Sequence, residues 1–478
     1  MKRIAWMAVA VGLFALVATP ALADDQPTAR DIQAAVDSYL ASASQDATLV
    51  GGPGSAGYDQ GFWIRGGDFL LRINLTLQAR YEYFDYDKDE EASKFNGGGF
   101  DDQLNGGIWP GGDLSGFSMP RATLKFSGEA PCSIRYYTEL EFGDPGWFVW
   151  TPVYTLMQAN PAPFINQGYN YDIFREGWIE WGAADAFNFR MGKIKTPNTR
   201  QLMVAPELQQ FIDISMASAL TGALQPGYTD RNRDYGFMIH GIFGCSGEWQ
   251  YMLAVTNGDG GDTTRNVINP LTSDALAYSA RLNWAFLSGI GYTEGALKQN
   301  TCQWYGELGL WGHYYADRYD GGAGNVLVSH TAVYDRLAAG LDLALGYGGF
   351  SMTAAATYFE ASGSDYVVLN DEEWMLFLVQ AGYHFPGTAW EIAARWSSYT
   401  RKIKAAADIE PTTNEFGFAV NYYLNGHGNK MQLDFSYFDA EADGFQGGGY
   451  FDMYSGVPLG FNSNAGSYLI RFQWQLAL

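Results

Sequence analysis

Nine basic side chains fall on the polar phase of alternating segments that are spread along the chain. They are Arg72, Arg80, Arg121, Lys125, Arg135, Arg190, Arg281, Arg395 and Arg471. A guanidinium group can hold a carboxylate or a phosphate through two parallel hydrogen bonds, and it keeps its charge at physiological pH. Eight acids share this phase, namely Glu82, Glu139, Glu141, Glu176, Glu180, Asp342, Glu391 and Asp434. The sequence therefore predicts a surface of mixed charge, on which each arginine either meets anions or pairs with a neighbouring carboxylate.

Motifs for enzymatic or metal chemistry are absent from the sequence. The five histidines are scattered, and the chain contains neither His-Glu-x-x-His nor Gly-x-Ser-x-Gly. The run Asp85-x-Asp87-x-Asp89 imitates the start of a calcium loop, but Glu90 stands where that loop requires glycine. The three cysteines match no zinc or redox spacing, although Cys245 and Cys302 would lie on neighbouring turns. We expect no enzyme, no metal site and no cofactor.

The segment 68–87 shows which kind of element positions these charges. Apolar or aromatic residues occupy every second position from Phe69 to Tyr83, and polar residues such as Arg72 and Arg80 lie between them. Because successive strand side chains point to opposite faces, this is a strand with one apolar and one polar face. Strands of soluble proteins usually have about five or six residues, whereas a tilted strand needs about nine to eleven to cross a bilayer. The alternative is a long strand of a soluble sandwich.

The same alternation recurs in later segments, which brings the predicted total to about sixteen strands. The later segments are 122–126, 134–142, 174–181, 187–195, 235–243, 249–255, 275–286, 303–315, 337–347, 350–360, 373–385, 389–400, 415–424, 431–438 and 466–478. Short turns alternate with long, acidic loops, as in outer-membrane barrels, and one longer stretch, 288–301, falls on the short-turn side. The pattern predicts an all-β fold, a transmembrane antiparallel β-barrel.

The N-terminus predicts export. Residues 1–23 have a basic start, an apolar run and an Ala-x-Ala cleavage site, which is typical of a signal peptide. Residues 24–60 form either a short periplasmic helix or a disordered leader, followed by a linker that includes the Gly-rich stretch 51–57, and 61–478 form the barrel. A net charge of −23 makes nucleic acid an improbable partner. We expect the chain in the outer membrane, in contact with lipid and inserted by the barrel assembly machinery.

Seven motifs occur in order along the mature chain: PRATLKFSG (120–128), REGWIEW (175–181), FRMGKIKTP (189–197), RDYG (233–236), LAVTNGDG (253–260), WEIAARWS (390–397) and NYYLN (421–425). In this order they resemble the phosphate-selective porin O/P family of outer-membrane channels. The resemblance implies a barrel of sixteen strands, usually trimeric, with the third long loop folded into the lumen as a constriction. Two features depart from the family. The chain ends on Leu478 rather than on an aromatic residue, and it has no lysine cluster on an inner loop, so phosphate selectivity is not implied.

The resemblance places the constriction in the third long loop, residues 196–233. Its candidate residues are Arg200, Glu207, Asp213, Tyr228, Asp230, Arg231 and Arg233. The acids Glu207, Asp213 and Asp230 would then face the arginines of the wall. Such an arrangement would create a transverse field that orients dipolar solutes.

Taken together, these features predict an outer-membrane porin, a water-filled channel for passive diffusion of small hydrophilic or ionic solutes, in a homotrimer. Three alternatives stay open. One is a substrate-specific channel for phosphate or another anion. Another is a membrane enzyme such as a phospholipase, which would need a Ser/His pair on the lipid face. The third is a structural or adhesive surface barrel.

Overall fold

The computed structural model describes residues 54–59, 61–86, 114–143, 173–223, 232–258, 276–289, 291–297, 303–318, 333–364, 372–403, 412–441, 450–451, 458–459 and 466–478. The predicted signal peptide and most of the predicted periplasmic segment lie outside these residues. Among the described residues, no helix is long and apolar enough to cross a membrane.

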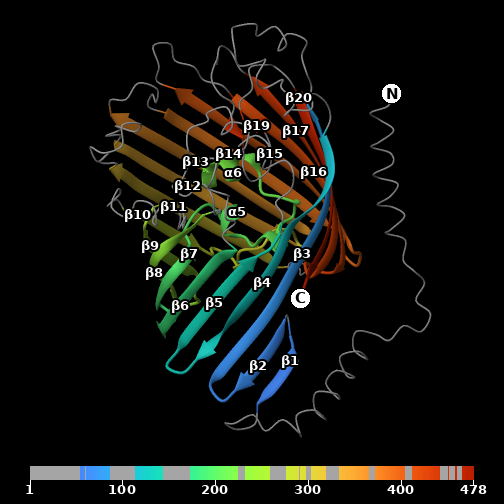
Figure 1. Ribbon diagram of the computed structural model, residues 1–478. Helices are drawn as coiled ribbons and strands as arrows, with labels where there is room; N and C mark the ends of the chain where they lie inside the picture. Colours follow the sequence, from blue (N-terminus) through green and yellow to red (C-terminus); the bar gives the residue numbers. More distant parts are fainter. Residues whose placement is uncertain are drawn as a thin grey trace, which may run out of the picture.

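Sixteen strands form the barrel, as the sequence predicts: β3 (Phe69–Tyr86), β4 (Leu114–Ala130), β5 (Ile134–Glu141), β6 (Phe174–Ala184), β7 (Phe187–Lys195), β8 (Arg233–Phe243), β9 (Trp249–Thr256), β10 (Ala277–Trp284), β11 (Trp304–Arg318), β12 (Val333–Tyr347), β13 (Phe350–Ser364), β14 (Glu372–His384), β15 (Trp390–Ile403), β16 (Thr412–Asn425), β17 (Asn429–Glu441) and β20 (Gly466–Ala477). Each strand pairs antiparallel with the next, and β20 pairs with β3 to close the barrel (Figure 1). Closure leaves no unpaired edge between the first and the last strand.

Several strands are longer than their sequence pattern indicates. The strand predicted over 122–126 begins at Leu114 and has 17 residues. Its outward apolar residues Phe117 and Met119 lie on the opposite phase from Leu124, so the alternation does not continue in one phase. The register of β3 and β4 shifts between Gln78 and Arg80, which marks a β-bulge.

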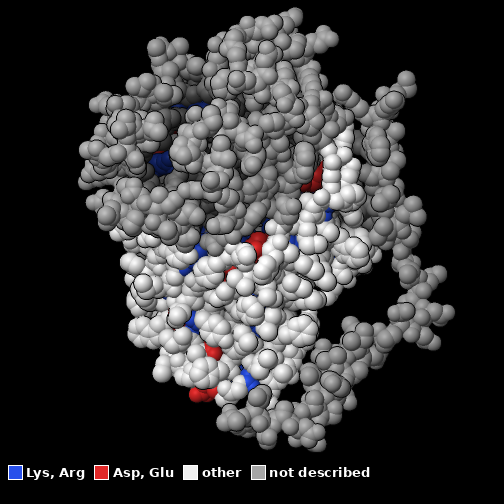
Figure 2. All heavy atoms as spheres, viewed as in Figure 1, with Lys and Arg blue, Asp and Glu red and all other residues white. Residues whose placement is uncertain are grey.

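The two faces of each strand differ as the alternation predicts. In β10 buried and exposed residues alternate over all eight positions. Residues such as Leu253, Leu310 and Phe418 are exposed on the outside, while Gln78 and Asn421 are fully buried inside. Charged atoms are sparse on the visible face of the described strands (Figure 2). This distribution, apolar outside and polar inside, suits a wall that faces lipid.

Aromatic side chains form a girdle at the short-turn end of the wall. Neighbouring strands contribute the stacked pairs Trp249–Trp284 and Trp304–Tyr347, whose ring centroids lie 5.5 and 4.8 Å apart. At the long-loop end, Tyr83 contacts Tyr468. Aromatic rings of this kind occupy the lipid–water boundaries of outer-membrane barrels.

A short hairpin precedes the barrel. It consists of β1 (Ser55–Tyr58) and β2 (Phe62–Gly66), and β2 pairs with β3 below the end of β20 (Figure 1). The prediction of a flexible linker over 51–57 was therefore wrong for residues 55–57. Gly57 packs against the Trp63 ring, and a Cβ at position 57 would lie 2.6 Å from that ring, so the ring would have to move. A separate two-stranded sheet pairs β18 (Tyr450–Phe451) with β19 (Pro458–Leu459).

The segment between β7 and β8, which we call the third loop, lies inside the barrel. Its described part includes α5 (Arg200–Met203), the 3₁₀ turn η3 (Pro206–Leu208) and α6 (Met216–Ala223). In Figure 1 both α5 and α6 lie between the walls. The prediction of a third long loop in the lumen is confirmed.

Candidate functional site

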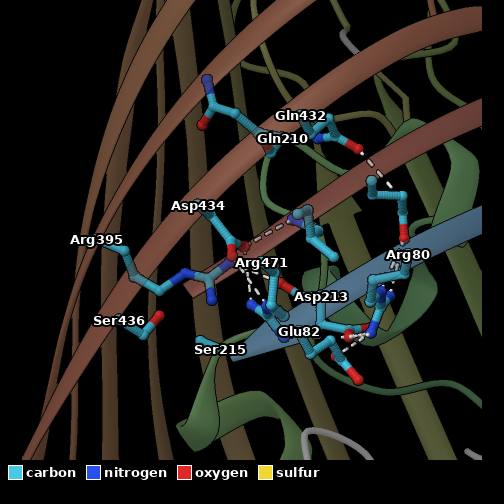
Figure 3. A network of polar contacts seen from close by, with 12 residues as sticks. Arg80, Glu82, Gln210, Asp213, Ser215, Arg395, Gln432, Asp434, Ser436 and Arg471 are labelled. Carbon is cyan, nitrogen blue, oxygen red and sulfur yellow. Dashed lines mark hydrogen bonds and ion pairs between the residues drawn. The ribbon is translucent and has the colours of Figure 1, made fainter. Parts of the chain in front are cut away.

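Asp213 on the third loop is the centre of a network of arginines from the wall (Figure 3). Its carboxylate accepts hydrogen bonds from Arg80 of β3 at 2.7 Å, from Arg121 of β4 at 3.3 Å and from Arg471 of β20 at 3.2 Å. Its backbone carbonyl accepts another from Arg395 of β15 at 2.8 Å. Four inward strand positions therefore hold one loop residue.

The same guanidinium groups also contact carboxylates of the wall. Arg471 binds Asp434 through two nitrogens, at 2.9 and 2.8 Å. Arg395 pairs with Glu415 at 3.1 Å, and Arg80 pairs with Glu82 at 3.1 Å. The side chains of Arg395 and Arg471 are only 0% and 3% exposed. Because a buried charge is stable only when it is paired and hydrogen-bonded, these contacts make the network a structural anchor.

A second anchor holds the start of the third loop. Arg281 of β10 binds Asp342 of β12 bidentately, with both distances 2.7 Å, and also donates to the Asn198 carbonyl at 2.7 Å. Asp342 accepts in addition from the Arg200 backbone N–H. Gly309 of β11 lies between Arg281 of β10 and Asp342 of β12, and a Cβ on it would lie 2.2 Å from the Arg281 guanidinium. Arg200 itself pairs with Glu307 of β11 at 2.7 Å.

Helix α6 is held by its first amides and by its apolar face. The backbone N–H groups of Met216 and Ala217 donate to Glu415 and to Ser397 on the wall. These contacts satisfy two of the amides that a helix start leaves unpaired. The helix packs on inward apolar residues at the long-loop end of the wall, which are Trp311, Ala338, Phe359, Trp374, Leu376, Tyr399, Phe438 and Leu469.

On the side formed by β5, β6, β7 and β8, cations contact carboxylates within the wall. Glu180 accepts from Arg135 at 2.8 Å, from Arg190 at 2.7 Å and from His240 at 2.6 Å. The Arg190 guanidinium also lies 3.8 Å from the centre of the Trp178 ring. Here the side chains of Arg135 and Arg190 are 45% and 19% exposed. Arg135 and Arg190 therefore present charge to solvent, although their partner Glu180 is 1% exposed.

A second cluster lies nearer the long-loop end of the same side. A β-bulge opposite Glu139 brings both Arg175 and Glu176 to the inner face. Arg175 contacts Glu141 at 2.9 Å, and Arg233 contacts Glu176 at 3.0 Å. The cluster joins β5, β6 and β8.

Lys125 of β4 and Glu207 of the third loop form an ion pair between wall and loop. Burial alone would raise the pKa of Glu207, but the charge and hydrogen bond of Lys125, together with a backbone hydrogen bond, lower that pKa below its usual value. The carboxylate thus stays ionised at neutral pH.

The structure places the predicted residues in three settings. Arg80, Arg121, Arg281, Arg395 and Arg471 hold the third loop, and Lys125 pairs with it. Arg135 and Arg190 lie on the β5–β8 side. Arg72 lies at the short-turn rim, where it donates to the Asp59 carbonyl. Arg233 is the first residue of β8 rather than part of the loop, and Tyr228, Asp230 and Arg231 lie outside the described residues.

Sequence reasoning missed several partners. Glu307 and Glu415 have the inward phase of their strands and could have been included with the other acids. The inward apolar residues that pack on α6, which we call the inner apolar patch, were also detectable, because residues 374–379 are apolar on both faces. Glu294, which lies in the longer stretch on the short-turn side, had no signal of its own. The described residues contain no group of three or more His, Cys, Asp or Glu that could hold a metal ion, and Cys132 and Cys245 are exposed and free.

No family model and no curated protein matches the sequence. Solved structures do match. The chain is similar over 86% of its length to the whole of an anion-selective porin from Comamonas acidovorans, with a TM-score of 0.52 and 10% identity. It is similar over 86% of its length to 99% of the outer-membrane expressed OmpT of Vibrio cholerae, with a TM-score of 0.50 and 10% identity. At this identity the likeness concerns the fold alone, and it shows that the chain has the closed antiparallel barrel fold of porins.

Proposed function

We propose that the protein is an outer-membrane porin that lets small hydrophilic or ionic solutes diffuse through a water-filled channel. The observation that carries the proposal is the asymmetry of the lumen. Arginines of β3, β4, β15 and β20 hold the third loop at Asp213, and on the other side Lys195 of β7 donates to the Met203 and Val204 carbonyls. The side chains of Arg135 and Arg190 on the β5–β8 side are partly exposed. A barrel of sixteen strands is wide enough for an aqueous path beside such a loop.

The proposed path passes Arg135, Arg190 and His240, with Lys125 and Glu207 at the edge of the loop. Each basic residue here has a carboxylate partner. This pairing favours a general channel over a phosphate-specific one, because a selective anion site needs cations that are free to bind solute. Membership of the phosphate-selective porin O/P family therefore enters the proposal as a relationship of fold and motifs, without phosphate selectivity.

The proposal includes a homotrimer, a cleaved signal peptide, insertion by the barrel assembly machinery and no enzymatic activity. The apolar outer face supports contact with outer-membrane lipid. N-terminal sequencing of the exported protein tests the signal peptide, and a mature chain that begins at Asp24 is the expected result.

Planar-bilayer recording tests the channel. Refolded protein whose mobility in a gel depends on heating should give stable conductance in groups of three equal steps. Folded protein that never conducts would refute the proposed function and favour a structural or adhesive barrel. The reversal potential in a salt gradient then measures the preference between anions and cations.

A further inference from the structure

A second segment enters the lumen from the short-turn side. Residues 291–297, between β10 and β11, carry Thr293, Glu294 and Ala296, whose exposed fractions are 5%, 3% and 0%. A periplasmic turn normally lies at the rim of a barrel and is exposed. Burial of this one means that it packs inside the wall.

Glu294 binds the third loop through both carboxylate oxygens. One oxygen accepts from the Gln201 side chain at 2.9 Å, and the other accepts from the Gln210 backbone N–H at 2.9 Å. The second oxygen also accepts from Gln380 of β14 at 3.1 Å. The Glu294 backbone N–H donates to the Leu208 carbonyl at 3.1 Å. One residue of the segment therefore contacts the loop at three positions and the wall at one.

Contacts on either side of Glu294 continue this attachment. The Gly291 carbonyl accepts from Arg200, and its backbone N–H donates to Glu307 at 3.0 Å. The Ala296 backbone N–H donates to Glu391 at 3.2 Å, and Glu391 also accepts from the Gln210 side chain at 2.9 Å. The segment thus meets the third loop along 200–210, and Gln380 connects Glu294 to Arg395 of the Asp213 network.

We propose that residues 291–297 act as a periplasmic brace that fixes the position of the third loop, with Glu294 as the positioning residue. The arginines hold Asp213 from the wall, and the brace holds the α5–η3 part of the loop from the short-turn side. Without the brace, that part of the loop keeps wall contacts such as those of Lys195 with Met203, Lys430 with Gln209 and Asn421 with Gln210. It loses the contacts of Glu294 at Gln201, Leu208 and Gln210. The width of the lumen then depends on a turn outside the loop itself.

Hydrogen exchange of the third loop tests the brace in the full-length folded protein. Glu294→Gln keeps the size of the side chain but places an NH₂ group against donors that need an acceptor. Exchange in residues 200–210 should become about tenfold faster, because a buried donor left without its acceptor is destabilising. Glu129→Gln is the matched control: Glu129 lies at the short-turn end of β4, is 56% exposed and should exchange as the native protein does. Native exchange rates in Glu294→Gln would refute the brace.

A cross-linking experiment distinguishes loss of the brace from a general loss of folding in Glu294→Gln. Leu208→Cys with Thr293→Cys, joined by a short bis-maleimide in a variant with serine at positions 132, 245 and 302, ties the loop to the brace. Slow exchange restored by this cross-link in the Glu294→Gln background supports the brace, and failure to restore it in a folded barrel contradicts it.

Conductance gives a second readout, and only this one rests on the proposed function. Glu294→Gln channels should be larger and noisier than native ones, while Glu129→Gln channels should be native. If the native protein never conducts, the channel function fails, whereas the exchange data still judge the brace. If the native protein conducts and Glu294→Gln matches it in both readouts, the brace alone is refuted.

Discussion

On the side of the lumen formed by β15, β17, β20, β3 and β4, arginines reach across to the third loop. On the side formed by β5, β6, β7 and β8, arginines of the same inward phase bind carboxylates of adjacent strands. The Arg395 side chain on the first side is 0% exposed, whereas that of Arg135 on the second is 45% exposed. The same residue type therefore does two things in one barrel.

Solvent explains why the two sides should behave differently. An ion pair in contact with water contributes little, about 0–1 kcal/mol, because water and salt screen it. Breaking a buried pair costs more, about 3–5 kcal/mol, because the remaining charge is left without a partner in a poorly solvated site. We therefore expect substitutions on the loop-bound side to change stability, and substitutions of the partly exposed Arg135 and Arg190 on the β5–β8 side to change ion preference.

The largest effect should come from Asp213→Asn. The change removes one charge that three guanidinium groups share, those of Arg80, Arg121 and Arg471. We expect a loss of about 3–5 kcal/mol in the free energy of unfolding, measured by urea titration of the refolded protein in detergent. Asp185→Asn, in an exposed turn, is the control. A loss under about 1 kcal/mol would place the network among weak surface pairs.

A glycine on the inner face of β14 supplies a smaller effect on the same side. A Cβ at Gly382 would lie 2.1 Å from the Gln210 side-chain nitrogen, which donates to Glu391 and Ser351. Overpacking by Gly382→Ala should cost about 1–3 kcal/mol in unfolding free energy.

Gly312→Ala is the matched control for that substitution, since the nearest atom to its Cβ would be 3.7 Å away. Both glycines lie within strands, so replacement of glycine has a similar effect on the backbone in both variants. Equal unfolding free energies of Gly382→Ala and Gly312→Ala would mean that Gln210 moves aside without a measurable cost.

The strands could be predicted because alternation is a local property of the sequence. The contacts of the third loop could not, because they join residues far apart in the chain. Asp213 is 133 residues from Arg80, 92 from Arg121 and 258 from Arg471. The sequence shows that these charges exist and which way they point, but it does not show which of them meet. The acid Asp213, predicted to face the wall arginines across the lumen, instead contacts them directly.

The inner apolar patch illustrates the same limit. The run from Trp374 to Val379 shows a strand that is apolar on both faces, and such strands pack on both sides. Nothing in the run identifies Leu220 of α6 as the packing partner. The entry of 291–297 into the lumen was equally hidden, because its evidence consists of backbone and side-chain hydrogen bonds to distant residues.

The ratio of anion to cation permeability should also distinguish the two sides of the lumen. Arg190→Gln removes a partly exposed cation whose partner Glu180 keeps Arg135 and His240. The unfolding free energy should fall by less than about 1 kcal/mol. The ratio of anion to cation permeability, obtained from the reversal potential in a salt gradient, should fall. If Arg190→Gln leaves that ratio native, the β5–β8 side does not line the conducting path.

The smallest effect concerns pH, at the boundary between the two sides. The pKa of Glu207 is lowered because Lys125 and a backbone hydrogen bond together outweigh burial. The pair therefore contributes stability above the ordinary pKa of 4.5 and loses it as pH falls below that value. Between about pH 5 and about pH 3, the unfolding free energy of the native protein should fall by up to about 1 kcal/mol more than that of Glu207→Gln. The variant has no carboxylate to protonate at that position. Urea titrations of both proteins across this range measure the difference and cancel the other carboxylates, which the two share. If the difference in unfolding free energy between the two proteins does not change with pH, Lys125 and Glu207 pair too weakly to hold the third loop. The contrast between the two sides of the lumen would then rest on the buried arginines alone.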